Sequence, residues 1–141
     1  MANQLSEAAL EALSARENSR ARELIDRVLI HHPEHSRALQ IQAMIALRSQ
    51  RFEEALEASF RALKGTPSDP VVTNIAASAM RQLHRFEEAE SLLRESLQVA
   101  PHLAETHLNL ALTLMDVGSY AKAETFFRNV IALRDDSERA F

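Results

Sequence analysis

The chain has 141 residues, of which 46% are apolar and 26% charged, and its net charge is −4. This length allows one domain of ordinary size, and the acidic balance provides no basic surface of the kind that nucleic-acid-binding proteins use. The chain contains only two glycines and four prolines, too few turn-forming residues for a fold of many strands. It is rich in the helix-forming residues alanine, leucine, glutamate and arginine, so its composition predicts an all-α fold.

Apolar residues spaced three and four positions apart predict eight helices in chain order. The expected ranges are 3–14, 19–31, 36–48, 53–65, 70–82, 87–99, 104–116 and 121–133. A proline follows the second, fourth and sixth of these helices, where it cannot continue the helical hydrogen bonding. Before the fifth helix, Ser68 or Asp69 can cap a helix whose first residue is Pro70.

A fixed period runs through the chain. The peptide RFEEA occurs at Arg51–Ala55 and again 34 residues later at Arg85–Ala89, and a further step reaches SYAKA at Ser119–Ala123. Alanine recurs at two positions of each block, where a small residue lets two antiparallel helices approach closely. These alanines are Ala9, Ala43, Ala77 and Ala111, and Ala21, Ala55, Ala89 and Ala123. The period predicts four repeats, at approximately residues 2–35, 36–69, 70–103 and 104–137.

The four blocks resemble the tetratricopeptide repeat family over essentially the whole chain. The last block matches best, with family residues at Asn109, Leu110, Ala111, Gly118, Tyr120, Ala123, Phe127 and Val130. The first block is the weakest, because Asn18 stands where an aromatic is usual and Arg16 where glycine is common; Gln50 and His84 replace the same glycine. The resemblance implies a right-handed superhelical solenoid of about four helix-turn-helix repeats, in which the first helices line a concave groove and the second helices lie on the convex side.

The resemblance also implies a non-catalytic protein-interaction or scaffold module, because this family typically holds an extended peptide or a partner's helix in the groove. The family's groove positions here include Arg37, Gln40, Met44, Leu47, Arg48, Asn74, Ser78, Arg81, Gln82, Leu108, Leu112 and Met115. Amides can both donate to and accept from an extended backbone, and arginine can bind a carboxylate with two hydrogen bonds. Alternatively, the apolar members of this set pack against adjacent first helices. Arg48 and Arg81 lie in the last turn of their helices, where the helix dipole stabilises a positive charge, and this alone can explain them.

One subfamily holds the terminal carboxylate of chaperone tails with a lysine at the fifth position of a block and an asparagine at the ninth. Here those positions hold Ser6 and Leu10, Gln40 and Met44, Asn74 and Ser78, and Leu108 and Leu112. No block matches this pattern, so we do not expect that specificity.

The densest group of potential metal ligands is HHPEH, at residues 31–35. Histidine can bind zinc, nickel or copper, but Pro33 ends the helix and no further ligand pair completes a known spacing, so we expect a polar turn and no metal. His107 lies at an inward position, where we expect a packed and hydrogen-bonded side chain. No phosphate-binding loop, HExxH pair or nucleophile elbow is present, so we expect neither a cofactor nor catalysis.

The second helices carry glutamates that we interpret as a solvated convex face, supported by the spaced pairs Glu57–Arg61 and Glu90–Arg94. No apolar run is long enough to span a membrane, and MANQLSEAAL lacks the pattern of a signal peptide. There is no cysteine and therefore no disulfide framework. We therefore expect a cytoplasmic protein, with another protein as its partner and neither nucleic acid nor membrane.

After residue 133 the sequence reads RDDSERAF. Its acidic and Ser residues suit a helix start, so residues 134–141 are predicted to begin a cap or a further repeat, with Phe141 at an inward position. The apolar face of the helices near 104–133, including some of Leu110, Leu114, Phe127 and Ile131, would then remain exposed, which is typical of an interface or a truncation. We therefore expect a homo-oligomer through the C-terminal end or a parent protein that continues. A further alternative is the non-catalytic N-terminal repeat domain of a larger enzyme, such as a bacterial transferase.

Overall fold

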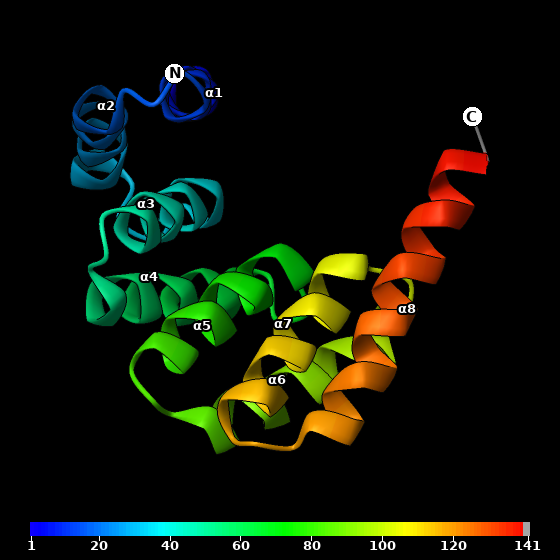
Figure 1. Cartoon of the computed structure of the whole chain (residues 1–141). Coiled ribbons are helices and arrows are strands. Elements are labelled where there is room, and N and C mark those ends of the chain that lie inside the picture. Colours follow the sequence, from blue (N-terminus) through cyan, green and yellow to red (C-terminus); the bar gives the residue numbers. More distant parts are fainter. Residues whose placement is uncertain (140–141) are drawn as a thin grey trace.

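The structure, a computed structural model, describes residues 1–139, which form eight helices joined by short turns (Figure 1). The helices are α1 (Ala2–Ser14), α2 (Asn18–His31), α3 (Ser36–Arg48), α4 (Phe52–Gly65), α5 (Pro70–Gln82), α6 (Phe86–Val99), α7 (Ala104–Asp116) and α8 (Tyr120–Arg139). Consecutive helices form four pairs that stack along a curved path from α1 to α8, as Figure 1 shows. The predicted all-α fold, a right-handed solenoid of helix-turn-helix repeats, is confirmed.

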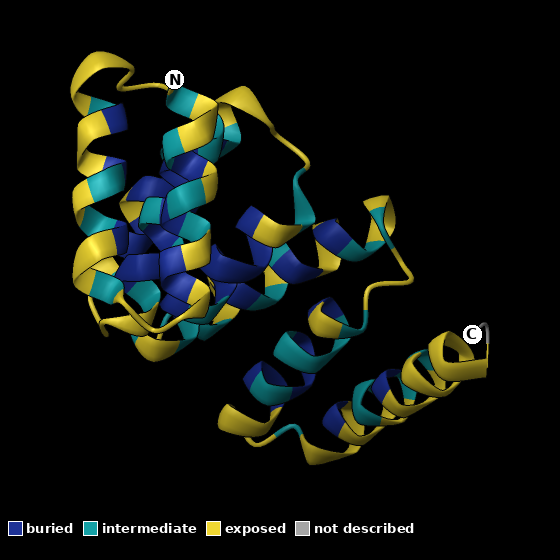
Figure 2. Ribbon diagram, turned by 90° about the horizontal axis from the view of Figure 1, so that it is seen from above, coloured by how far each residue is buried: buried dark blue, intermediate teal, exposed yellow. Residues whose placement is uncertain are grey.

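Small residues hold the helices of each pair together. The alanines that recur at two positions of every repeat are all at most 1% exposed. Larger apolar side chains, such as Leu39, Leu93 and Leu110, are fully buried beside them. In Figure 2 the buried residues accordingly lie along the lines where helices meet. The period in the sequence therefore records the positions where two helices cross closely.

The first helices of the repeats form a continuous inner layer. Helix α1 contacts α3, α3 contacts α5, and α5 contacts α7. Over the described residues, the backbone of a second helix approaches the first helix of its own repeat and that of the next repeat. Second helices are linked to one another by side chains, as in the 3.3 Å ion pair between Arg22 on α2 and Glu54 on α4. We call the exposed side of α1, α3, α5 and α7 the inner face.

Each turn from a first to a second helix contains one residue with a left-handed backbone. These residues are Arg16, Gln50, His84 and Gly118, with φ of 62°, 59°, 60° and 82°. The residue that follows each of them donates its N–H back into the last turn of the helix, as in the 2.8 Å bond from Arg51 to the carbonyl of Ala46. This is the helix-ending arrangement that favours glycine, and it explains why the family has glycine there.

Side chains cap two of the first helices. Asp69 Oδ1 accepts a 2.9 Å hydrogen bond from the Val71 N–H, as predicted for this aspartate or its neighbour. His35 Nδ1 accepts a 3.1 Å bond from the Ala38 N–H. Its Nε2 must then carry the proton, and it donates to Asn3 Oδ1 at 3.2 Å. Both ring nitrogens of His35 are thus engaged in joining α1 to α3.

The repeated RFEEA peptide has a structural explanation in the start of α4 and α6. Its arginine lies 3.7 Å from the second glutamate in the first copy and 2.7 Å in the second, measured from nitrogen to carboxylate oxygen. Its phenylalanine is half-buried and its alanine fully buried. The predicted pair Glu90–Arg94 is confirmed at 3.0 Å. The pair Glu57–Arg61 is wrong, because Arg61 instead donates to the Pro33 carbonyl at 2.6 Å in the preceding inter-repeat turn.

Helix α8 is longer than the sequence predicts. It was expected to end at residue 133 and to be followed by a new helix start, but it continues without a break to Arg139. Asp135 stands where earlier repeats have a proline, so nothing removes the helical hydrogen bonds at this point. The expected inward position of Phe141 lies outside the described residues. None of the described helices has the length and hydropathy needed to cross a membrane.

Candidate protein-interaction surface

The inner face carries a line of half-buried side chains from successive first helices. Met44 on α3, Ser78 on α5 and Leu112 on α7 occupy the same position of their repeats, and each is partly exposed. Because α3, α5 and α7 contact one another in sequence, these residues follow one another across the face. The structure therefore places them in one row along the first helices.

Of the predicted groove residues, the apolar ones lie on α3 and α7, and those on α5 between them are polar. On α3, Met44 and Leu47 are half-buried and pack against the core, so each exposes only part of its side chain. On α7, Leu108 is half-buried, and Met115 is 43% exposed. Apolar side chains that remain accessible in a row provide area that a partner can bury.

The three arginines among the predicted groove residues bind neighbouring repeats. Arg48 Nη1 donates to the backbone carbonyl of Leu13 at 2.6 Å. Arg37 Nη2 lies 3.6 Å from Glu7 Oε1, and Arg81 Nε lies 3.1 Å from Asp116 Oδ2. These contacts join α3 to α1 and α5 to α7. A guanidinium has five N–H donors, so each retains donors for a partner, but its position is fixed by the protein itself.

Of the three amides expected to meet a partner's backbone, Gln82 is exposed, but Gln40 and Asn74 lie deeper than the sequence suggested. Asn74 is 4% exposed; its Nδ2 donates to Thr106 Oγ1 at 3.0 Å, and its Oδ1 accepts from Asn109 Nδ2 at 3.1 Å. Gln40, at the same position of the preceding repeat, is 8% exposed. Asn74 therefore joins α5 to α7, and both amides lie beneath the inner face. The first helices approach one another at this position, which the sequence pattern within one repeat does not reveal.

A hollow of about 410 Å³ lies at one edge of the inner face, where α5 ends and α6 begins. It is lined by Arg81, Gln82, His84, Phe86 and Asp116. The His84 ring meets the edge of the Phe86 ring, with centroids 5.4 Å apart. The sequence did not point to His84 or Phe86 as site residues, although a histidine at a glycine position was a visible signal. The hollow combines an ion pair with an aromatic wall, which suits one side chain of a partner.

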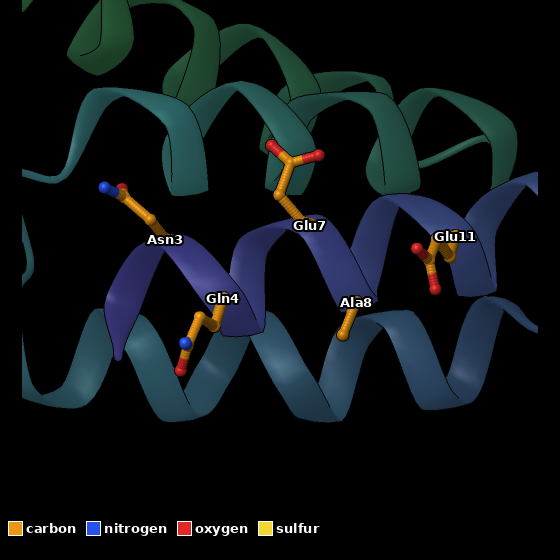
Figure 3. A pocket seen from close by; sticks show the side chains of 5 residues that line it. All are labelled: Asn3, Gln4, Glu7, Ala8 and Glu11. Carbon is orange, nitrogen blue, oxygen red and sulfur yellow. The ribbon is translucent and has the colours of Figure 1, made fainter.

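A second hollow, of about 440 Å³, lies on the outer side of α1 and is lined by that helix alone. Figure 3 shows its five residues: Asn3, Gln4, Glu7, Ala8 and Glu11. Asn3 and Glu7 point toward the neighbouring helix α3 in this view, in line with the ion pair between Glu7 and Arg37. The hollow is shallow, carries two amides and two carboxylates, and forms the N-terminal edge of the solenoid.

His107 is packed and hydrogen-bonded, as predicted. Its Nε2 donates to the Pro101 carbonyl at 2.9 Å, and its Nδ1 lies 3.5 Å from Asn129 Nδ2. The ring centroid is 5.9 Å from that of Phe126, over which the Arg94 guanidinium lies at 5.7 Å. This histidine therefore connects α7 to α8 and to the preceding turn, and both of its nitrogens have partners.

The resolved pKa shifts come from one surface ion pair. Arg85 donates from Nε and Nη2 to the two carboxylate oxygens of Glu88, at 3.0 and 2.7 Å. These hydrogen bonds lower the pKa of the Glu88 carboxyl and raise the pKa of Arg85, with desolvation opposing both effects. The charge of Glu53 in the preceding repeat adds to the raised pKa of Arg85. Among residues 1–139, no group of three histidine or acidic side chains is arranged to hold a metal ion.

Comparison with known proteins identifies the repeats. The tetratricopeptide repeat family matches residues 6–70 and again residues 80–141. The peroxisomal targeting signal receptor of Candida glabrata is 25% identical over 87 residues, which is 62% of this chain and 15% of the receptor. The chain thus corresponds to a small part of that relative's length.

Solved structures share the architecture. A thermophilic TPR protein from Thermus thermophilus superposes with a TM-score of 0.87 at 23% identity, covering 96% of this chain and 75% of that one. MamA from Desulfovibrio magneticus RS-1 gives a TM-score of 0.85 at 17% identity, covering 96% and 77%. At these identities the likeness establishes the fold. Together with the two family matches, it shows that the chain belongs to the tetratricopeptide repeat family.

Proposed function

We propose that this protein is a non-catalytic interaction module or scaffold that binds a segment of a partner protein along its inner face. The observation that carries the proposal is the row of accessible side chains on successive first helices, with Met44, Ser78 and Leu112 at its centre. Membership of a family of protein-interaction repeats supports the same class of function.

The chemistry of the surface favours an extended peptide or one face of a helix. Apolar side chains of the partner would pack on Met44, Leu112 and Met115. A polar side chain would enter the hollow beside the Arg81–Asp116 ion pair, where hydrogen-bonding groups are fixed in place. The curated relative is named as a receptor for a targeting signal, which supports a peptide as the ligand class. Gln40 and Asn74 would form the floor of the site.

Two alternative functions rest on other features of the molecule. As the N-terminal repeat domain of a larger enzyme, the same solenoid would position a catalytic part supplied by further sequence. As a self-associating repeat, it would use the exposed apolar residues of its C-terminal edge, where Tyr120 is 67% and Ile131 is 62% exposed. Both alternatives leave the inner face available to a partner.

Affinity capture from the native lysate tests the proposal with two sets of variants. The inner-face variant Leu112→Glu/Gln82→Glu places charge on the proposed surface without removing an arginine that joins two repeats or a side chain that packs against the core. The matched convex variant Ser91→Glu/Gln98→Glu adds the same charge at exposed positions of α6. We expect the inner-face variant to lose a captured protein that the convex variant retains, with the same unfolding temperature in both.

The opposite pattern, in which the partner is lost only with the convex variant, would contradict the inner-face proposal. A partner lost with neither variant would do the same. Arg48→Glu/Arg81→Glu is a less clean variant, because both side chains also stabilise the stacking of repeats.

A further inference from the structure

The second helix of each internal repeat has a side that the next first helix covers. On α4, which packs against α5, Leu56 is 4% and Ser59 is 0% exposed. On α6, which packs against α7, Leu93 is 0% exposed. Counting in steps of 34 residues from α4 and α6 therefore identifies the side of α8 that a following first helix would cover.

None of the described residues covers this side of α8. Tyr120 is 67% and Ile131 is 62% exposed, and Phe127 is half-buried where its equivalents Ser59 and Leu93 are fully buried. In Figure 2, α8 shows buried residues along one side only. We call Tyr120, Phe127 and Ile131 the open edge.

The opposite end of the solenoid does not fit the open edge. The outer side of α1 carries Asn3, Gln4, Glu7 and Glu11, as Figure 3 shows. Stacking a second molecule head to tail would press these carboxylates and amides against apolar side chains, and burying polar groups without partners is unfavourable. An open edge that meets another open edge buries apolar area on both sides.

The sequence of α8 is complementary to itself when two copies run antiparallel. Tyr120, Glu124, Phe127, Ile131, Arg134 and Glu138 alternate at spacings of four and three residues, the pattern of a coiled-coil seam. If a two-fold axis passes beside Asn129, Phe127 faces Ile131 of the second copy, and Glu124 faces its Arg134. One apolar pair and one charged pair then match on each side of the axis, and Tyr120 faces Glu138 of the second copy at the ends of the pairing.

We propose that the open edge is an interface for a second copy of this chain, formed by antiparallel pairing of α8 with α8. The length of α8 supports this: it has 20 residues, against 14 in α2, α4 and α6. The extra turns begin at Arg134, whose side chain is exposed. Glu124 lies 2.7 Å from Arg128 in the isolated molecule, but both side chains are mostly exposed, so exchanging this partner for Arg134 costs little.

This dimer develops the self-association alternative and uses a surface other than the partner-binding inner face. Failure of the dimer would therefore leave the inner-face proposal untouched, and loss of partner binding would leave the dimer untouched. The two are separated by measuring the mass of the protein alone, without any partner.

Sedimentation equilibrium of the 141-residue chain tests the interface. We expect a mass of about twice 15.8 kDa, and a monomer for Ile131→Glu with unchanged helix content. The matched control is Ile30→Glu, since Ile30 is 74% exposed on α2 at the other end of the molecule; this variant should remain a dimer. A wild-type monomer at all concentrations, or a dimer that survives Ile131→Glu, overturns the proposal.

Cross-linking tests the antiparallel register, because the chain has no cysteine of its own. The double variant Glu124→Cys/Arg134→Cys should form a disulfide-linked dimer on mild oxidation. Each single variant should not, because the two copies of one position lie about 15 Å apart along an antiparallel pair. A double variant that stays uncross-linked, or single variants that cross-link equally well, overturns the proposed pairing.

Discussion

Arg81 and Asp116 form an ion pair across the junction of the third and fourth repeats, with 3.1 Å between Nε and Oδ2. Both residues line the hollow at the edge of the inner face, and Arg81 is one of the predicted groove residues. The side chains are 21% and 44% exposed, so the pair is accessible to a ligand while also joining α5 to α7. The same two residues therefore contribute to stacking and to the proposed site.

A double-mutant cycle should separate these contributions. Arg81→Glu brings two carboxylates together and should lower the free energy of unfolding by about 0.5–1 kcal/mol, the range for a partly solvated pair. Adding Asp116→Arg reverses the pair and should recover most of the loss. Urea denaturation measures both effects. If the double variant were as unstable as the sum of the two single variants, the pair would not be stabilising.

The left-handed residues in the intra-repeat turns make a second prediction. Replacing Gln50 (φ 59°) with glycine removes backbone strain but adds freedom to the unfolded chain, so we expect a net gain of about 0.5 kcal/mol. Gly118→Ala should destabilise by about 1 kcal/mol, because the φ of 82° is unfavourable for a residue with a side chain. The added methyl group would meet no atom within 4 Å, so the loss would come from the backbone conformation alone. Thermal unfolding checks both signs, and a lower melting temperature for Gln50→Gly would argue against strain at this turn.

Ala89 tests the close approach of two helices. It is 0% exposed, so Ala89→Leu should overpack the junction and cost about 1–3 kcal/mol. Ala132→Leu is the matched control, since Ala132 is exposed on α8, and we expect little change there. Equal unfolding temperatures for Ala89→Leu and the wild type would contradict the packing described here.

Asn18 is a defect of the first repeat that can be repaired. Its Oδ1 is buried without a hydrogen-bond partner, at the position where the other repeats have Phe52, Phe86 and Tyr120. Replacing Asn18 with phenylalanine removes an unsatisfied acceptor, whose burial costs about 1–3 kcal/mol, and adds apolar contact. We expect a higher melting temperature for Asn18→Phe. The reverse change, Phe86→Asn, should lower it, and a destabilised Asn18→Phe would show that the first repeat has no room for the ring.

The sequence was sufficient to predict the helices, because their positions depend on local signals. The expected bounds of α3, α5 and α7 agree with the structure, and the second helices α2, α4 and α6 begin one residue earlier than expected, since the aromatic position is already helical. Prolines marked three of the four second-helix ends. The fourth end was wrong because it relied on the period alone, where Asp135 permits the helix to continue.

The contacts between repeats could not be predicted, because they depend on how far each repeat is rotated against the next. The sequence placed Asn74 on the groove surface, but that rotation brings it against Thr106 and Asn109. The same geometry directs Arg61 to the Pro33 carbonyl instead of its neighbour on the helix. The sequence pattern within one repeat does not show how far that repeat is rotated against the next. It therefore cannot tell which side chains bind a neighbouring repeat and which stay exposed to a partner.

Site-specific photo-cross-linking tests the inner-face proposal most directly. A benzophenone amino acid is introduced at Ser78 on the inner face, or at Ser91, which is exposed on the convex side of α6, and each protein is irradiated in the native lysate. The proposed function predicts a discrete adduct with another protein from position 78 and none from position 91. An adduct only from position 91, with none from position 78, would contradict binding along the inner face.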